Sequence, residues 1–189
     1  MKLYHSIKRL FIWLKRFRYR KGYGVHSPFA FNFITHVVYQ KSPYYKYSLL
    51  EKLPKDIYES EKMKEFLFRL TNYIQPNSIY YKTDKNSIFP LFNWVKSDVE
   101  VCDNLSSDLI YLSLGTNVDL IKKELINLNK FTTKSTVLVI YGIGYNKEMK
   151  SFWQSLINDS KSGISFDLYD YGILFFDLSK NKEDYIVNF

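Results

Sequence analysis

The sequence has 189 residues, of which 46% are hydrophobic and 24% are charged, so it can bury the core of one domain and is not a wholly disordered chain. Its single cysteine, Cys102, excludes an intrachain disulfide and a cysteine-rich zinc site, and it is typical of a reducing compartment such as the cytoplasm. The net charge of +8 is concentrated at one end. Residues 1–50 contain ten lysines and arginines and no acid, which leaves 17 bases and 19 acids in the rest of the chain.

Residues 1–24 are predicted to form a basic arm that contains an amphipathic helix. At about 100° per residue, one side of this helix is apolar and consists of Leu3, Ile7, Leu10, Phe11, Leu14 and Phe17. Roughly opposite lie basic residues, and the candidates for contact with an anionic surface are Lys8, Arg9, Lys15, Arg16 and Arg20. The uncharged runs are too short for a transmembrane span or a secretory signal.

Three interpretations of this arm stay open. The helix could pack its apolar side against the protein's own body and leave its basic side in solvent. It could instead lie on an anionic membrane surface, as a peripheral protein at the inner face of the membrane. A nucleic-acid arm is the third interpretation, and it is disfavoured because the rest of the chain has no basic groove and no recognisable nucleic-acid-binding module.

Residues 25–75 are predicted to form a helical extension. Ser27 followed by Pro28 is typical of a helix N-cap and first turn, and the helix is expected to continue to about Gln40. His26 is expected to be a buried histidine that hydrogen-bonds the backbone and fixes the arm to the body. A loop is expected over 54–60, and a further helix over 61–74 that stops before Pro76.

Residues 76–189 are predicted to form an α/β domain. The apolar run Thr136–Tyr141 is typical of a strand that is buried on both faces of a parallel sheet. Helices are expected over 89–95, 118–128 and 147–158, and the other strands over 78–81, 99–102, 108–112, 163–168, 172–176 and 185–189. Strands and helices alternate first and strands then follow one another closely, which indicates an open α/β sheet with an antiparallel pair at its end. Ligands of such sheets bind beyond the carboxyl ends of the parallel strands.

Four stretches of the sequence resemble one family over nearly the whole chain. They are Tyr23–Phe31, Pro43–Tyr45, Phe66–Tyr73 and Gly163–Phe176. In these stretches the sequence is similar to class I S-adenosylmethionine-dependent methyltransferase-like proteins of Bacteroidota. The resemblance implies a Rossmann-like methyltransferase-type sheet with an antiparallel C-terminal hairpin, with S-adenosylmethionine as cofactor.

The residues that would serve methyl transfer in that family are largely missing here. The resemblance implies a glycine-rich turn after the first strand, where bare backbone can approach the cofactor, but residues 82–87 contain no glycine. Asp103, which follows the second strand, matches the acid that would bind the ribose. Ser113 and Tyr141 stand where the family carries acids that would activate the methyl acceptor or bind a metal.

The sequence therefore predicts a shortened, degenerate and catalytically inactive relative that acts as a binding or scaffold protein and does not bind the cofactor. An active methyltransferase with an atypical cofactor site is one alternative, and a membrane-associated protein anchored by the basic helix is another. No catalytic residue and no metal ligand is assigned. A homo-oligomer is neither favoured nor excluded. At the carboxyl ends of the strands, Tyr81, Phe89, Trp94 and Tyr141 are expected to fill the space that a ligand would need.

Overall fold

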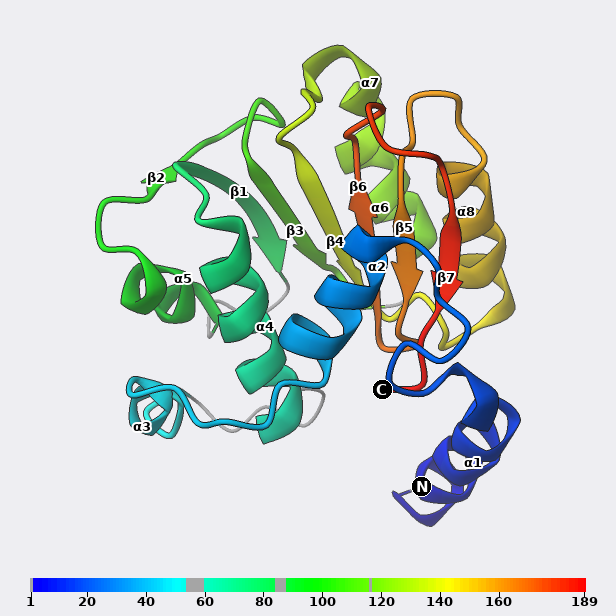
Figure 1. The fold of residues 1–189 in the computed structure, drawn as a ribbon. Helices are drawn as coiled ribbons and strands as arrows, with labels where there is room; N and C mark the ends of the chain where they lie inside the picture. The colour runs from blue at the N-terminus through cyan, green and yellow to red at the C-terminus, as the bar shows by residue number, and fades with distance from the viewer. Residues whose placement is uncertain (1, 54–59, 84–87, 116) are drawn as a thin grey trace.

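The structure is a computed structural model that describes residues 2–53, 60–83, 88–115 and 117–189, with only the backbone at residues 2–8 and 129. It is a mixed α/β fold built on a seven-stranded sheet in the order β2-β1-β3-β4-β6-β5-β7 (Figure 1). The strands are β1 (Ser78–Thr83), β2 (Glu100–Val101), β3 (Leu109–Ser113), β4 (Val137–Tyr141), β5 (Ser165–Asp167), β6 (Tyr171–Phe175) and β7 (Asp184–Ile186).

The sheet is mostly parallel. β2, β1, β3 and β4 run in one direction, and β6 pairs antiparallel with both β4 and β5. The predicted antiparallel pair is thus confirmed, and β7 adds a further strand parallel to β5 at the sheet edge. The register aligns Tyr81 with Tyr111 and Tyr141 with Tyr171.

The longer helices occur where the sequence predicts them, with shifted ends, and a short helix that was not predicted lies over 47–50. Their bounds are α1 (Lys2–Lys15), η1 (Phe17–Tyr19), α2 (Pro28–Phe33), η2 (Ile34–Val38), α3 (Tyr47–Leu50), α4 (Glu61–Ile74), α5 (Phe89–Val95), α6 (Val118–Leu125), α7 (Leu128–Phe131) and α8 (Lys147–Ile157). The helix expected over 28–40 continues from α2 into a single π-helical turn, η2. The helix expected over 118–128 is interrupted between α6 and α7. Most of the loop expected over 54–60 lies outside the described residues.

The sheet separates two apolar cores. Side chains of β3 alternate between them, with Leu109 and Tyr111 on one face and Ile110 and Leu112 on the other, as the period-two geometry of a strand requires. The first face is covered by α2, η2, α4 and α5, and the second by α6 and α8 (Figure 1). The continuous apolar run of β4 is explained by burial on both faces, which confirms the prediction for this strand.

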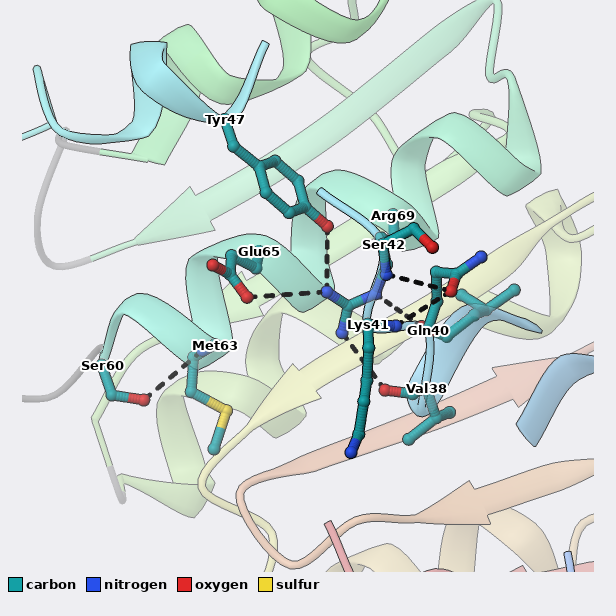
Figure 2. Close-up of polar contacts among 10 residues, drawn as sticks. Val38, Gln40, Lys41, Ser42, Tyr47, Ser60, Met63, Glu65 and Arg69 are labelled. Atoms are coloured by element: carbon teal, nitrogen blue, oxygen red, sulfur yellow. Dashed lines mark hydrogen bonds and ion pairs between the residues drawn. The ribbon is translucent and has the colours of Figure 1, made fainter. Parts of the chain in front are cut away.

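A buried arginine ties the helical extension together. Arg69 of α4 donates from Nε to the carbonyl oxygen of Val37 at 2.7 Å and from Nη2 to that of Val38 at 3.2 Å (Figure 2). Its Nη1 donates to the Tyr47 hydroxyl at 3.0 Å and lies 3.8 Å from the Glu65 carboxylate. The carbonyl groups at the end of a helix have no partner inside that helix, so Arg69 satisfies the end of η2 in the protein interior.

Candidate functional site

A chain of polar groups lies at the carboxyl end of β4, the edge at which ligands of α/β sheets bind. The Tyr145 hydroxyl lies 2.8 Å from the Tyr141 hydroxyl and 2.8 Å from Oδ1 of Asp170. It donates to the carboxylate, and the second hydrogen bond joins the two hydroxyls. Burial, followed by the negative charge of Asp170, raises the pKa of Tyr145, so this phenol stays protonated at neutral pH.

Asp170 reaches this position from the turn between β5 and β6. Its side chain is only 5% exposed, and Nη2 of Arg9 from α1 forms an ion pair with the same Oδ1 that accepts from Tyr145. Burial, the largest single effect, lowers the pKa of Arg9, but the charges and hydrogen bonds of Asp170 and Tyr145 together raise this pKa overall. The carboxylate at this edge is therefore occupied by two donors of the protein itself.

Two glycines after β4 allow the β5–β6 turn to approach. Gly142 has a φ of +82°, and its N–H donates to the carbonyl oxygen of Asp170. A Cβ at Gly144 would lie 2.3 Å from the ring of Tyr169, so only glycine permits this contact. The two glycines therefore allow Tyr169 and Asp170 to lie against the end of β4.

Sequence reasoning missed Asp170. Ser113 and Tyr141, which stand where the resembling family carries acids, are the last residues of β3 and β4. The carboxylate comes from a turn 29 residues farther along the chain, and nothing in the spacing indicates where that turn folds back. The only available signal was the acid-rich turn itself, with Asp167 and Asp170 on either side of a left-handed Tyr169 at φ +73°.

Asp103, the predicted ribose ligand, is an exposed residue just after β2. Its charge acts on the hydroxyl of Tyr80, which donates to Glu124 of α6. Burial, then the hydrogen bond to Glu124 and the two negative charges, raises the pKa of Tyr80. The ribose role of Asp103 stays a prediction.

Four aromatic rings were expected to fill the space at the carboxyl ends of the strands. Tyr81 stacks on Phe89 with ring centroids 5.0 Å apart, Tyr141 is buried, and Trp94 is partly buried. Residues 84–87, which belong to the glycine-free turn, lie outside the described residues. The prediction that these rings fill the whole ligand space is therefore untested.

The predicted Ser27-Pro28 helix start is confirmed, but the role given to His26 is wrong. Ser27 Oγ accepts from the N–H of Ala30 at 3.3 Å, and Pro28 is the first residue of α2. The His26 side chain is exposed, so it is not a buried lock between arm and body. The last turn of α1 and η1 are instead joined to the body by Asn188, which donates to the carbonyl oxygens of Trp13 and Tyr19, each at 3.0 Å.

Arg9 of α1 and Arg16, which directly follows this helix, attach it to the β5–β6 turn. Besides the pair of Arg9 with Asp170, Arg16 forms a bidentate pair with Asp167, with both N···O distances at 2.9 Å. A pocket of about 490 Å³ lies between α1 and the turn. Arg9 and Arg16 belong to the basic side of the helix. The interpretation in which the apolar side packs against the body placed this basic side in solvent.

The apolar face of α1 is the one exposed. The exposed fractions are 57% for Leu10, 68% for Phe11, 54% for Leu14 and 54% for Phe17. The interpretation in which the helix packs its apolar stripe on the body is therefore wrong for these side chains. Among the other predicted surface residues, Lys15 is exposed and Arg20 stacks over the rings of Trp13 and Phe17, whereas the side chain of Lys8 lies outside the described part.

Neither a metal centre nor a membrane-spanning helix emerges from the described part of the chain. Among residues 2–53, 60–83, 88–115 and 117–189, His, Cys, Asp and Glu side chains do not gather in groups of three or more that could hold an ion. Over the same ranges, every helix is too short or too polar to cross a bilayer. No protein-family model matches the chain, and no curated protein matches its sequence.

Proposed function

We propose that this protein is a degenerate relative of class I S-adenosylmethionine-dependent methyltransferases that does not transfer methyl groups and acts as a binding or scaffold protein in the cytoplasm. The four stretches that resemble the family support this proposal. A mostly parallel sheet whose β6 is antiparallel to both β4 and β5 is compatible with the Rossmann-like arrangement that the resemblance implies.

The observation that carries the proposal is the engagement of Asp170. A general base must accept a proton from the substrate through an accessible lone pair within hydrogen-bonding distance. Oδ1 of Asp170 already accepts from Tyr145 and Arg9, and the side chain is nearly buried. The described acid at this edge therefore serves to hold α1 and Tyr145 in place.

The turn after β1, where the resemblance implies a glycine-rich cofactor turn, also supports the proposal. Backbone can approach a bound ligand closely where residues lack a Cβ, and the stretch after β1 has no glycine in its sequence. Glycines with positive φ follow β3 and β4 instead, at Gly115 and Gly142. We therefore do not propose S-adenosylmethionine as a resident cofactor.

An isothermal titration of the full chain with S-adenosylmethionine tests the proposal. We expect no binding at micromolar concentrations of the donor. Micromolar binding that weakens about tenfold in Asp103→Asn would overturn it, since one lost charged hydrogen bond to a ribose hydroxyl is worth about 1.5–3 kcal/mol. Lys122→Gln, on an exposed face of α6, is the matched control for a surface substitution.

An active methyltransferase with an atypical site is the second candidate. The hydrogen-bonded chain from the Tyr141 hydroxyl through the Tyr145 hydroxyl to Asp170 favours it, because such a chain could pass a proton to the carboxylate. It requires the methyl donor to bind, so the same titration decides between the two candidates.

A further inference from the structure

We propose that α1 and the turn after it form a surface that binds anionic lipids, and that the body holds this helix with its apolar face directed outward. The inference is independent of the proposed lack of catalysis. It rests on three features of residues 9–31: the attachment of the helix, the exposure of its apolar side chains, and the charge around them.

The attachment fixes the rotation of the helix. Arg9 lies in α1 and Arg16 directly follows it, seven residues on and on the same side, and their partners Asp170 and Asp167 lie at one turn. Near the end of the arm, Asn188 holds the carbonyl oxygens of Trp13 and Tyr19. In Figure 1, α1 projects from the body near the chain's C-terminus.

The free surface is the apolar one. At about 100° per residue, Leu10 and Leu14 lie about 100–140° around the helix from Arg9, and Phe17 follows in η1. Their side chains and that of Phe11 are each more than half exposed. Large apolar side chains that stand together in water along one helix face mark a binding surface.

The apolar surface continues beyond α1. An open pocket of about 770 Å³ begins at Phe17 and reaches α2. Its lining contains both rings and cations, namely Phe17, Tyr23 and Phe31 with Arg18, Arg20 and Lys21. Aromatic rings and long cationic side chains both favour the interface between the acyl chains and headgroups of a bilayer, because each combines an apolar body with a polar end.

The positive charge of this region favours an anionic lipid surface as its binding partner. Residues 1–50 contain ten bases and no acid, and among the described side chains of residues 9–20 the ion pairs are those of Arg9 with Asp170 and of Arg16 with Asp167. A second copy of this chain would bring like charges together on the same face. A nucleic acid would neutralise the charge but would leave the exposed leucine and phenylalanine side chains in water. An anionic bilayer satisfies both features, and each base near its surface adds affinity.

Cosedimentation of the full chain with lipid vesicles tests the inference. We expect binding to vesicles of phosphatidylcholine and phosphatidylserine, much weaker binding to pure phosphatidylcholine, and release as salt rises. The double variant Phe11→Ser/Leu14→Ser is expected to weaken binding at least about tenfold, because it removes two inserted apolar side chains. The matched control Ile126→Ser/Leu178→Ser changes two apolar residues that are also exposed, and it should bind as the parent does.

A charge pair completes the test. Lys15→Glu/Arg18→Glu is expected to weaken binding to anionic vesicles at least about tenfold, while Lys122→Glu/Lys123→Glu on α6 leaves it nearly unchanged. Equal binding to neutral vesicles, or no effect of Phe11→Ser/Leu14→Ser, would overturn the inference. So would a dimer in sedimentation velocity that this variant abolishes, or binding of duplex DNA or single-stranded RNA in place of vesicles. Circular dichroism of each variant verifies that it is folded.

Discussion

Two helical segments precede the sheet, and they are attached to it by different physical means. The segment of α2, η2 and α4 buries apolar side chains such as Phe33 and Phe66 in the same core as the sheet. Its arginine, Arg69, is buried and bonds to backbone carbonyl groups. The helix α1 is attached through Arg9 and Arg16 to two aspartates, with its apolar face in water.

The two segments therefore differ in how they depend on the core: the first is integrated into it, and α1 is attached to it. Burial of apolar area provides most of the free energy of folding, so the first segment belongs to the cooperative unit of the sheet. Ion pairs between partly exposed groups contribute about 1 kcal/mol or less and weaken with salt. We therefore expect α1 to be held in orientation by the body without adding much to its stability.

The largest effect is expected from truncation inside the shared core. The Phe166 ring is fully buried, with its centroid 4.4 Å from that of Phe33 and 5.4 Å from that of Tyr185. Phe166→Ala should lower the free energy of unfolding by about 3–5 kcal/mol in urea denaturation. Phe11→Ala, on the exposed side of α1, is the matched control and should change it by less than about 0.5 kcal/mol. Equal losses would show that α1 is part of the core.

The second effect concerns the buried arginine. Arg69→Met keeps an apolar side chain of similar length but leaves the carbonyl groups of Val37 and Val38 unpaired in the interior. We expect a loss of about 2–4 kcal/mol, measured by chemical denaturation. Arg18→Met, whose parent side chain is exposed, should be nearly neutral. A neutral Arg69→Met would mean that water can replace the guanidinium at the end of η2.

At alkaline pH, the hydrogen-bonded chain of Tyr141, Tyr145 and Asp170 beside β4 should have a measurable effect on stability. The raised pKa of Tyr145 means that the folded state keeps a proton which the unfolded state releases above about pH 10. The stabilisation that follows from this raised pKa is fully present below about pH 10. It is lost as pH rises above about 10, by up to about 1.4 kcal/mol per pH unit. Thermal denaturation between pH 9 and 11 should show a shallower decline in Tyr145→Phe, and an unchanged slope would contradict this assignment.

The smallest effect on stability is expected from the attachment of α1 itself. Asp167→Ala removes the bidentate partner of Arg16 and should cost about 1 kcal/mol or less. Hydrogen exchange at the amides of α1 should accelerate while the amides of β4 stay protected. Asp177→Ala, which breaks the ion pair with Lys180, is the control and should leave α1 unaffected. Unchanged exchange in α1 would show that Arg16 does not hold the helix.

Much of the fold was predictable from the sequence because its signals are local. The apolar run of β4, the Ser27 cap and the alternation of strands and helices each depend on neighbouring residues. The candidate site was less predictable because its parts come from distant segments. Tyr145 and Asp170 meet only after the β5–β6 turn has folded back, and Arg9 joins them from 161 residues away.

The orientation of α1 could not be predicted from the sequence for the same reason. Periodicity identified an apolar side and a basic side, but it does not indicate which of them faces the protein. Core packing usually selects the apolar side. Here Asp167 and Asp170 on one tight turn select the basic side, and these acids are contiguous with α1 only in three dimensions.

The rotation of α1 is tested most directly by cysteine accessibility. In a Cys102→Ser background, Phe11→Cys samples the exposed face, and Ile12→Cys samples the partly buried side that lines the pocket against the β5–β6 turn. Without lipid, a water-soluble maleimide should modify position 11 much faster than position 12, and anionic vesicles should protect position 11. Faster modification at position 12, with position 11 protected in the absence of lipid, would mean that the apolar side faces the body and would contradict the account.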